Sequence, residues 1–252
     1  MSTAYSLRTP YIREIAGADT ALLMIHGIVG TPAHFSMLYP YVPGNWSIYN
    51  MVLAGHGGSV EDFAAANMAQ WKQQTADWIA ELSLRYEKIV IAAHSMGTLL
   101  AMEAVLQRPG RTSGLFLLNV PLKVLVRPRA VSNAFKVIFN RVSPTDDMAR
   151  AMQRAYGIRA DACLFKYLRW VPNYLALFRL IRQSRKRCGR IPVPCVCVQS
   201  DRDELVAPSS TKYLTGNPHI VVYRLERSGH FGYENKEREI LCERFAEFCR
   251  SP

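Results

Sequence analysis

The sequence predicts an α/β fold with a mostly parallel, doubly wound sheet, and three observations support this prediction. Apolar, β-rich runs recur along the chain, helical stretches separate them, and 252 residues suffice for one domain of this class. The runs that predict strands are residues 21–25, 47–52, 88–92, 114–118, 193–199 and 220–225. The stretches with apolar residues at helical spacing are residues 68–86, 98–106 and 233–248.

The composition is that of a globular protein. Hydrophobic residues make up 49% of the chain, and no apolar run reaches the roughly 20 residues that a membrane-spanning helix needs. Residues 1–13 show no signal peptide, so we expect a cytoplasmic protein. The six cysteines are scattered, and Cys195 and Cys197 alternate along a predicted strand, which is typical of buried thiols in a reducing compartment. Without histidines at finger-like spacing, they predict no metal site.

One long connection interrupts the alternation of strands and helices. About seventy residues separate the run that ends near Asn119 from the one that begins near Pro192, far more than the dozen or so that a simple crossover needs. We therefore expect residues 1–120 and 191–252 to form the core and residues 121–190 to form a helical insertion, within one continuous globular unit.

The basic charge of the chain is concentrated in this insertion. Residues 121–190 hold 16 Lys and Arg against 3 Asp and Glu, whereas the rest of the chain holds 15 against 17. The segment carries no nucleic-acid-binding motif and is rich in apolar residues, so we expect no nucleic-acid partner. The spacing of apolar residues in part of this segment predicts an amphipathic basic helix. We favour the interpretation that this helix packs on the core over a role at a membrane surface. Its apolar face would be Tyr174, Leu177, Phe178 and Ile181.

Ser95 lies where a predicted strand meets a predicted helix, in the sequence Ala-Ala-His-Ser-Met-Gly. A sharp strand-to-helix turn holds such a serine in a strained conformation and needs small residues two positions before and after it. These residues are Ala93 and Gly97, so the usual G-x-S-x-G pattern has alanine at its first glycine. The alternative is a serine that only caps the helix.

A nucleophilic serine needs a general base and an acid that orients the base, and on a doubly wound sheet these follow in the order Ser, Asp or Glu, His. Asp203 is our candidate acid because it follows a late strand and precedes an apolar pair, as the acid usually does. Asp201 is the closer rival and Glu204 the weaker one, and the whole stretch could be an acidic surface loop. His230 is the candidate base because it lies in a loop after the next strand.

The other five histidines have other expected roles. His94 would point away from Ser95, and His26 and His56 lie in glycine-rich turns where a structural hydrogen bond is expected. His219 begins a strand at the surface, and His34 is a further alternative. The glycine-rich turn after residues 21–25 also predicts an oxyanion hole, in which the backbone N–H groups of Ile28 and Met96 would act as donors.

Together these features resemble the α/β-hydrolase superfamily, and within it bacterial carboxylesterases and monoacylglycerol lipases. The resemblance rests on His26-Gly-Ile-Val-Gly30, Leu53-Ala-Gly-His-Gly57, the stretch 199–208 and Ser228-Gly-His230. It implies Ser95 as nucleophile, Asp203 as acid, His230 as base, Ile28 and Met96 as oxyanion donors, and a small cap after the sixth strand. The chain departs from the family's pattern at Ala93 and at Ala54, where many members have proline.

The resemblance implies a serine hydrolase that cleaves short- to medium-chain acyl esters or monoacylglycerols through an acyl-enzyme, without a metal or an organic cofactor. Thioester hydrolysis, acyl transfer and carbon–carbon bond hydrolysis use the same triad, and a non-catalytic binding protein is the alternative of another class. The expected partner is an apolar small-molecule ester, and the basic cap could make weak contact with anionic lipid. The apolar side chains that would supply a substrate pocket are Phe135, Ile138, Phe139, Leu164, Phe165, Leu168 and Trp170, and the alternative, ordinary packing against the sheet, must account for most of them.

Overall fold

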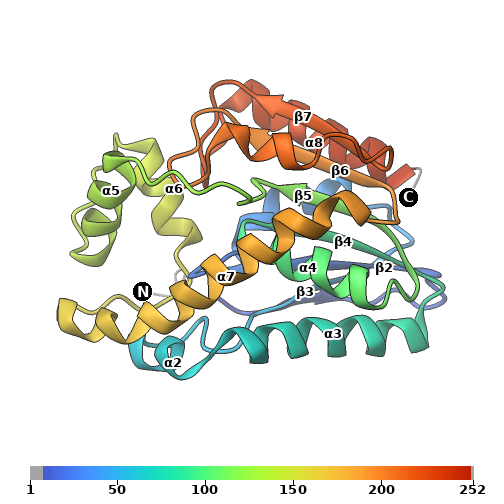
Figure 1. Ribbon diagram of the computed structural model, residues 1–252, viewed down its shortest axis with the longest axis horizontal. Helices are drawn as coiled ribbons and strands as arrows, with labels where there is room; N and C mark the ends of the chain where they lie inside the picture. The colour runs from blue at the N-terminus through green and yellow to red at the C-terminus, as the bar shows by residue number, and fades with distance from the viewer. Residues whose placement is uncertain (1–7, 251–252) are drawn as a thin grey trace.

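A computed structural model describes residues 8–250 as a seven-stranded sheet in the order β1-β3-β2-β4-β5-β6-β7 (Figure 1). Only the pairing of β1 with β3 is antiparallel, so the predicted mostly parallel α/β fold is confirmed. The expectation that residues 1–13 hold no signal peptide falls partly outside the described residues, which begin at residue 8. The strands are β1 (Tyr11–Arg13), β2 (Thr20–Ile25), β3 (Ser47–Asn50), β4 (Lys88–His94), β5 (Thr112–Leu118), β6 (Cys195–Ser200) and β7 (Ile220–Leu225).

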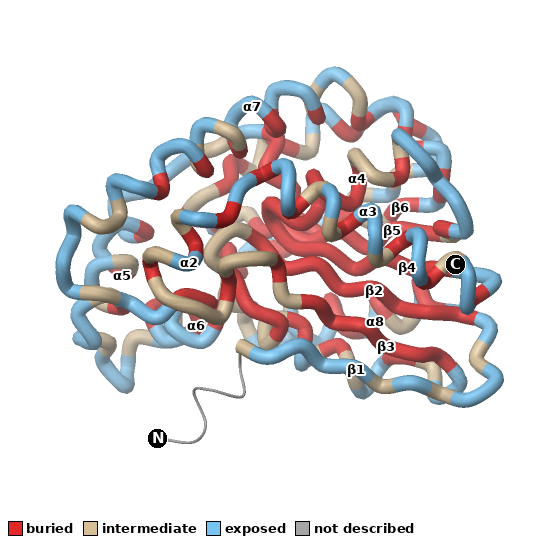
Figure 2. The backbone as a smooth tube through the Cα atoms, turned by 90° about the horizontal axis from the view of Figure 1, so that it is seen from below, coloured by how far each residue is buried: buried red, intermediate tan, exposed pale blue. Residues whose placement is uncertain are grey.

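The sheet is buried on both faces, as Figure 2 shows for its central strands. Alternate residues of a strand point to opposite faces, and in β4 Ile89 and Ile91 join one apolar cluster while Val90 joins the other. The first cluster includes side chains of α3 (Met68–Arg85), α4 (Met96–Gln107) and α7 (Val171–Arg187). The second includes side chains of η1 (Pro32–Tyr41) and α8 (Asn235–Arg250). This double burial explains why the strands read as continuous apolar runs.

Capping residues mark the starts of two helices that pack in the first apolar cluster. Ser59 and Asp62 form a reciprocal capping box at the start of α2 (Val60–Ala65), and Asn67 and Gln70 form another at the start of α3. The three predicted helices are present, with ends within two residues of those expected. The strand β1 and the helical turn η1 carried no clear pattern and were not predicted.

Residues 121–190 contain α5 (Pro128–Ile138), α6 (Asp147–Ala155), η2 (Leu164–Trp170), α7 and η3 (Cys188–Arg190). In Figure 1, α5 and α6 stand beyond one end of the sheet, whereas α7 runs back across the layer that contains α4. The segment follows β5, the fifth strand of the described chain. Within residues 8–250, the expectation that it follows the sixth strand is therefore wrong, because only the short β1 precedes β2 there. Its division from residues 1–120 and 191–252 as a cap stays a prediction.

The amphipathic helix forms as expected, with one exception on its apolar face. Leu177 and Ile181 of α7 are buried in the first core cluster, but the side chain of Phe178 is 50% exposed. Phe178 therefore lies outside the buried side of α7. Arg185 on the same helix donates from Nε to the Leu122 carbonyl and lies over the ring of Tyr213.

Two further expectations concern membrane segments and cysteines. Over residues 8–250, no helix combines the length and apolar character needed to cross a membrane. Cys195 and Cys197 are buried on β6 as predicted, and burial raises the pKa of the Cys197 thiol to about 12. These two thiols therefore stay protonated and pack as small apolar groups.

Candidate active site

Ser95 occupies a strained turn between β4 and α4. Its φ of 51° and ψ of −123° lie outside the ordinary regions for a residue with a side chain. Its backbone N–H donates to the Leu118 carbonyl of the neighbouring strand, which fixes the turn against β5. A Cβ on Gly97 would lie 2.2 Å from the Ile25 carbonyl oxygen, so this position requires glycine. Ala93, within β4, faces Ile25 of β2 and is fully buried, so the strand accepts a methyl group there.

The three predicted side chains meet at the carboxyl ends of the strands. The Oγ of Ser95 lies 3.1 Å from Nε2 of His230, and Nδ1 of His230 lies 2.7 Å from Oδ2 of Asp203. All three residues are buried. Because an ionised carboxylate can only accept, the Nδ1–H of His230 donates to Asp203 and leaves Nε2 free to accept the proton of Ser95. This is the geometry of a nucleophile, a base and an orienting acid.

The structure separates Asp203 from its two rivals. The second oxygen of Asp203 accepts from the N–H groups of Leu205 and Val206, both at 2.7 Å, which holds the carboxylate in place. Asp201 instead pairs with Arg224 of β7, at 2.7 Å from its guanidinium group. Glu204 lies closer to the site than the sequence suggested, although it contacts the backbone of His230 and not its ring.

Three residues that were not predicted to do so hold the peptide groups of His230. Oε2 of Glu204 accepts from the His230 N–H at 2.7 Å. The His230 carbonyl accepts from Nε2 of His94 at 3.0 Å and from the side-chain amide of Asn119 at 3.2 Å. Asn119 also accepts from the Ser200 N–H, so it connects the ends of β5 and β6 to the histidine loop. No sequence pattern marks Asn119, because its partners are far away along the chain.

The predicted oxyanion loop lies beside Ser95. A Cβ on Gly27 would lie 2.8 Å from the Cβ of Ser95, so glycine brings this backbone close to the nucleophile. Val29 has a positive φ of 48°, and the turn is closed by a bond from the Gly30 N–H to the Gly27 carbonyl. Ile28 lines the cavity at Ser95, and Met96 begins α4. Their roles as donors stay a prediction that this close approach supports.

His26 fixes the same loop, as expected of a structural histidine. Its Nδ1–H donates to the Gly27 carbonyl at 2.8 Å, and its Nε2 accepts from the Leu53 N–H at 3.1 Å. Burial lowers the pKa of His26 to about 4, and desolvation lowers that of His34 to about 3, with the nearby His230 as a second cause. Burial likewise holds the pKa values of His56 and His94 well below the ordinary range. All four rings are therefore neutral at pH 7.

A cavity of about 120 Å³ lies over Ser95 and His230. Residues 121–190 contribute Ala155 of α6 and Tyr174 of α7 to its lining. The seven apolar side chains expected to form the substrate pocket do not line this cavity, so that expectation is wrong. Phe135, Phe139, Leu164, Phe165 and Leu168 are exposed instead, and Trp170 is buried against α2, where its Nε1–H donates to the Val60 carbonyl.

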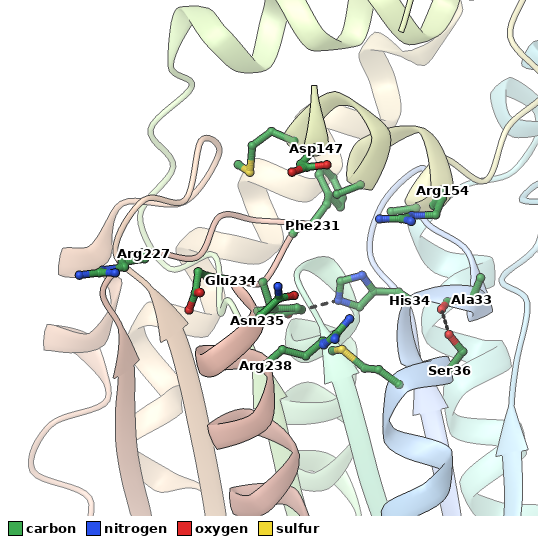
Figure 3. Close-up of a pocket in the computed structure, with 16 residues that line it drawn as sticks. Ala33, His34, Ser36, Asp147, Arg154, Arg227, Phe231, Glu234, Asn235 and Arg238 are labelled. Atoms are coloured by element: carbon green, nitrogen blue, oxygen red, sulfur yellow. Dashed lines mark hydrogen bonds between the residues drawn. The ribbon is translucent and has the colours of Figure 1, made fainter. Parts of the chain in front are cut away.

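A second cavity, of about 700 Å³, adjoins the first between η1, α6 and the start of α8 (Figure 3). Both cavities are lined by His34, Ala155 and Phe231, so the two cavities meet at these three residues. Among residues 8–250, no group of three or more His, Cys, Asp and Glu side chains has the arrangement of a metal site.

The model of the alpha/beta hydrolase family matches residues 22–241. This chain belongs to that family. A thermostable monoacylglycerol lipase of Bacillus sp. strain H-257 is 22% identical over 245 residues, which cover 95% of this chain and 93% of that lipase. A solved structure from work on LipS and LipT, two metagenome-derived lipolytic enzymes, aligns with a TM-score of 0.74 at 20% identity over 98% of both chains.

A solved structure described by another activity has the same fold. The enol-lactonase of Burkholderia xenovorans LB400 aligns with a TM-score of 0.69 at 15% identity, over 96% of both chains. The likeness to these structures establishes the fold of the chain. Its chemistry must be argued from the site.

Proposed function

We propose that this hydrolase cleaves carboxylic esters through an acyl-enzyme on Ser95. The observation that carries the proposal is the continuous chain of hydrogen bonds from the Ser95 hydroxyl through His230 to Asp203, with the serine in a strained turn. A helix-capping serine would have ordinary extended backbone angles and a side-chain bond to its own helix, and Ser95 has neither. The resemblance to a monoacylglycerol lipase along nearly the whole chain supports the same activity.

The geometry supports a two-step reaction. Ser95 attacks the ester carbonyl while Nε2 of His230 takes the proton from its hydroxyl. The buried carboxylate of Asp203, held by two backbone N–H groups, keeps the imidazole oriented and stabilises it once it is protonated. The N–H groups of Ile28 and Met96 stabilise the oxyanion, a contribution of about 10²- to 10³-fold in rate for one such donor. His230 then delivers the proton to the leaving alcohol, and water releases the acyl group.

The test is a panel of 4-nitrophenyl esters of graded acyl length, hydrolysed by the wild type and by Ser95→Ala. We expect Ser95→Ala to lose nearly all turnover, whereas Ser83→Ala, the same substitution near the carboxyl end of α3, should keep wild-type turnover as the matched control. Undiminished hydrolysis by Ser95→Ala would overturn the assignment of the nucleophile. Thioesters of the same acyl groups, assayed in parallel, show whether the site prefers oxygen or sulfur leaving groups.

The exposed apolar side chains of residues 121–190 support a contact with lipid as part of this function. Phe165 and Leu168 of η2 are 81% and 64% exposed, and Phe178 of α7 is half exposed beside Arg179 and Arg182. Apolar side chains among basic ones favour the surface of an anionic bilayer. Co-sedimentation with anionic vesicles should fall for Phe165→Ser and at high salt, and binding that is equal for neutral vesicles would refute the contact.

A further inference from the structure

The larger cavity beside the active site carries unpaired positive charge. Arg154 of α6, Arg227 after β7 and Arg238 of α8 all line it. Figure 3 draws Arg227 at one end of the cavity and His34 between Arg154 and Arg238. Across residues 8–250, none of the three guanidinium groups makes an ion pair or a side-chain hydrogen bond.

Neither of the two acidic residues in the lining forms an ion pair with these arginines. Oε2 of Glu234 accepts from the N–H groups of Lys236 and Glu237, so this carboxylate caps the start of α8. Asp147 has a side chain that is 94% exposed and lies 3.8 Å from Arg150 on its own helix. Because His34 is neutral at pH 7, the arginines are the source of positive charge in the cavity.

The remaining lining is mainly apolar and continues toward the nucleophile. Met37, Met148, Ala151 and Tyr233 line the cavity with His34, Ala155 and Phe231, which also line the cavity at Ser95. Ligand pockets usually measure about 300–1,000 Å³. The cavity of about 120 Å³ at Ser95 is therefore too small for a complete ligand of that size, whereas the adjoining cavity of about 700 Å³ is large enough.

We propose that the two cavities form one substrate site, in which Ser95 takes the ester group and the arginine-lined cavity takes an anionic group at the far end of the same substrate. The preferred substrates are then esters with an apolar chain that ends in a carboxylate or a phosphorus oxyanion. Arg154, Arg227 and Arg238 act in binding and take no part in bond cleavage. The inference rests on the proposed function and extends it from esters in general to anionic esters.

The test compares three 4-nitrophenyl esters of equal chain length: the octanoate, the hydrogen suberate and the 8-phosphonooctanoate. We expect the wild type to favour the anionic esters by about tenfold in kcat/KM, mainly through KM, because the contact is made equally in the ground state and the transition state. The relative rates for the suberate and the phosphonate identify the anion. Raising the salt to 0.5 M should reduce the preference.

Substitutions of the arginines locate the contact. Arg154→Gln and Arg238→Gln should each lower the ratio of kcat/KM for the anionic and neutral esters by about three- to tenfold, since each removes a charge-assisted hydrogen bond at a partly solvated site. Arg154→Lys should restore part of the ratio. Arg108→Gln, an equal loss of charge at the exposed carboxyl end of α4, is the matched control and should leave the ratio unchanged.

Equal hydrolysis of the octanoate and both anionic esters, with no effect of the arginine variants, would overturn the inference and leave the proposed function intact. If the wild type hydrolyses none of the three esters, the proposed function fails, and binding then decides the inference. Calorimetry with methyl hydrogen suberate and Ser95→Ala should show affinity that Arg154→Gln weakens. No binding, or binding that Arg154→Gln leaves unchanged, contradicts the anion site.

Discussion

The substitution Gly97→Ala tests the close packing on which the nucleophile depends. The new Cβ would lie 2.2 Å from the Ile25 carbonyl oxygen and 2.6 Å from that of His26. An ordinary contact at this point requires α4 and the end of β2 to separate by about 1 Å, at a cost of about 1–3 kcal/mol in folding free energy. The same movement carries Ser95 away from the oxyanion loop, and a displacement of about 1 Å can lower the rate by about 100-fold.

The assay pairs thermal unfolding with hydrolysis of a 4-nitrophenyl ester. We expect Gly97→Ala to lower Tm by about 5 °C, given the usual shift per kcal/mol for a chain of this size, and to lower kcat by about 100-fold. Gly189→Ala is the matched control, since a Cβ there meets no atom within 4 Å. Wild-type Tm and kcat in Gly97→Ala would refute the claim that this turn has no space for a methyl group.

Three further predictions concern the candidate acid Asp203, its neighbour Glu204 and the buried His26. Asp203→Asn should lower kcat by up to about 10⁴-fold, because it disturbs the orientation of His230. Asp201→Asn should change kcat less than twofold. A larger loss of kcat in Asp201→Asn than in Asp203→Asn would transfer the role of acid to Asp201. Glu204→Ala should lower kcat by about tenfold at nearly constant KM by freeing the His230 backbone, and Glu204→Gln, which keeps an acceptor, should restore most of it; equal losses in both variants would contradict this positioning role. His26 has a pKa of about 4 in the folded chain, below its unfolded value of about 6.5, so its contribution to stability is complete above pH 6.5 and is lost as the pH falls to about 4. Between pH 7 and 5 this loss amounts to about 2 kcal/mol, and urea unfolding of His26→Asn should show a correspondingly weaker pH dependence; an unchanged dependence would contradict the buried neutral imidazole.

Most of the sheet could be predicted because both of its faces are buried. Five of the six predicted strands appear with ends shifted by at most two residues, and the sixth matches β7 at both ends. The short edge strand β1 has no apolar run, since its residues are largely exposed. The candidate triad could also be predicted from the sequence. Its residues follow the carboxyl ends of successive strands, and in a parallel sheet these ends lie together at one edge.

The substrate pocket could not be predicted from the residue types of the segment 121–190. Phe165 and Leu168 read as pocket residues because they are large and apolar, yet they are exposed, and the small Ala155 lines the cavity instead. Burial of a side chain depends on how α5, α6 and α7 pack, and the periodicity of one helix contains no information about its neighbours. The exposure of Phe178 has the same cause.

The sequence by itself determined the order of the strands along the chain, the strained serine turn, and an acid and a histidine placed to follow it. Those features are local, because they depend on residue types within a few positions of each other. Only the tertiary structure decided that Asp203 and not Asp201 faces His230, that Glu204, His94 and Asn119 hold the histidine loop, and that three arginines line one cavity. Most of these contacts join residues that are far apart in the sequence. Asp201 and Asp203 are only two positions apart, and the course of the backbone after β6 decides which of them faces His230. These arrangements therefore exist only once the sheet and its covering helices have packed.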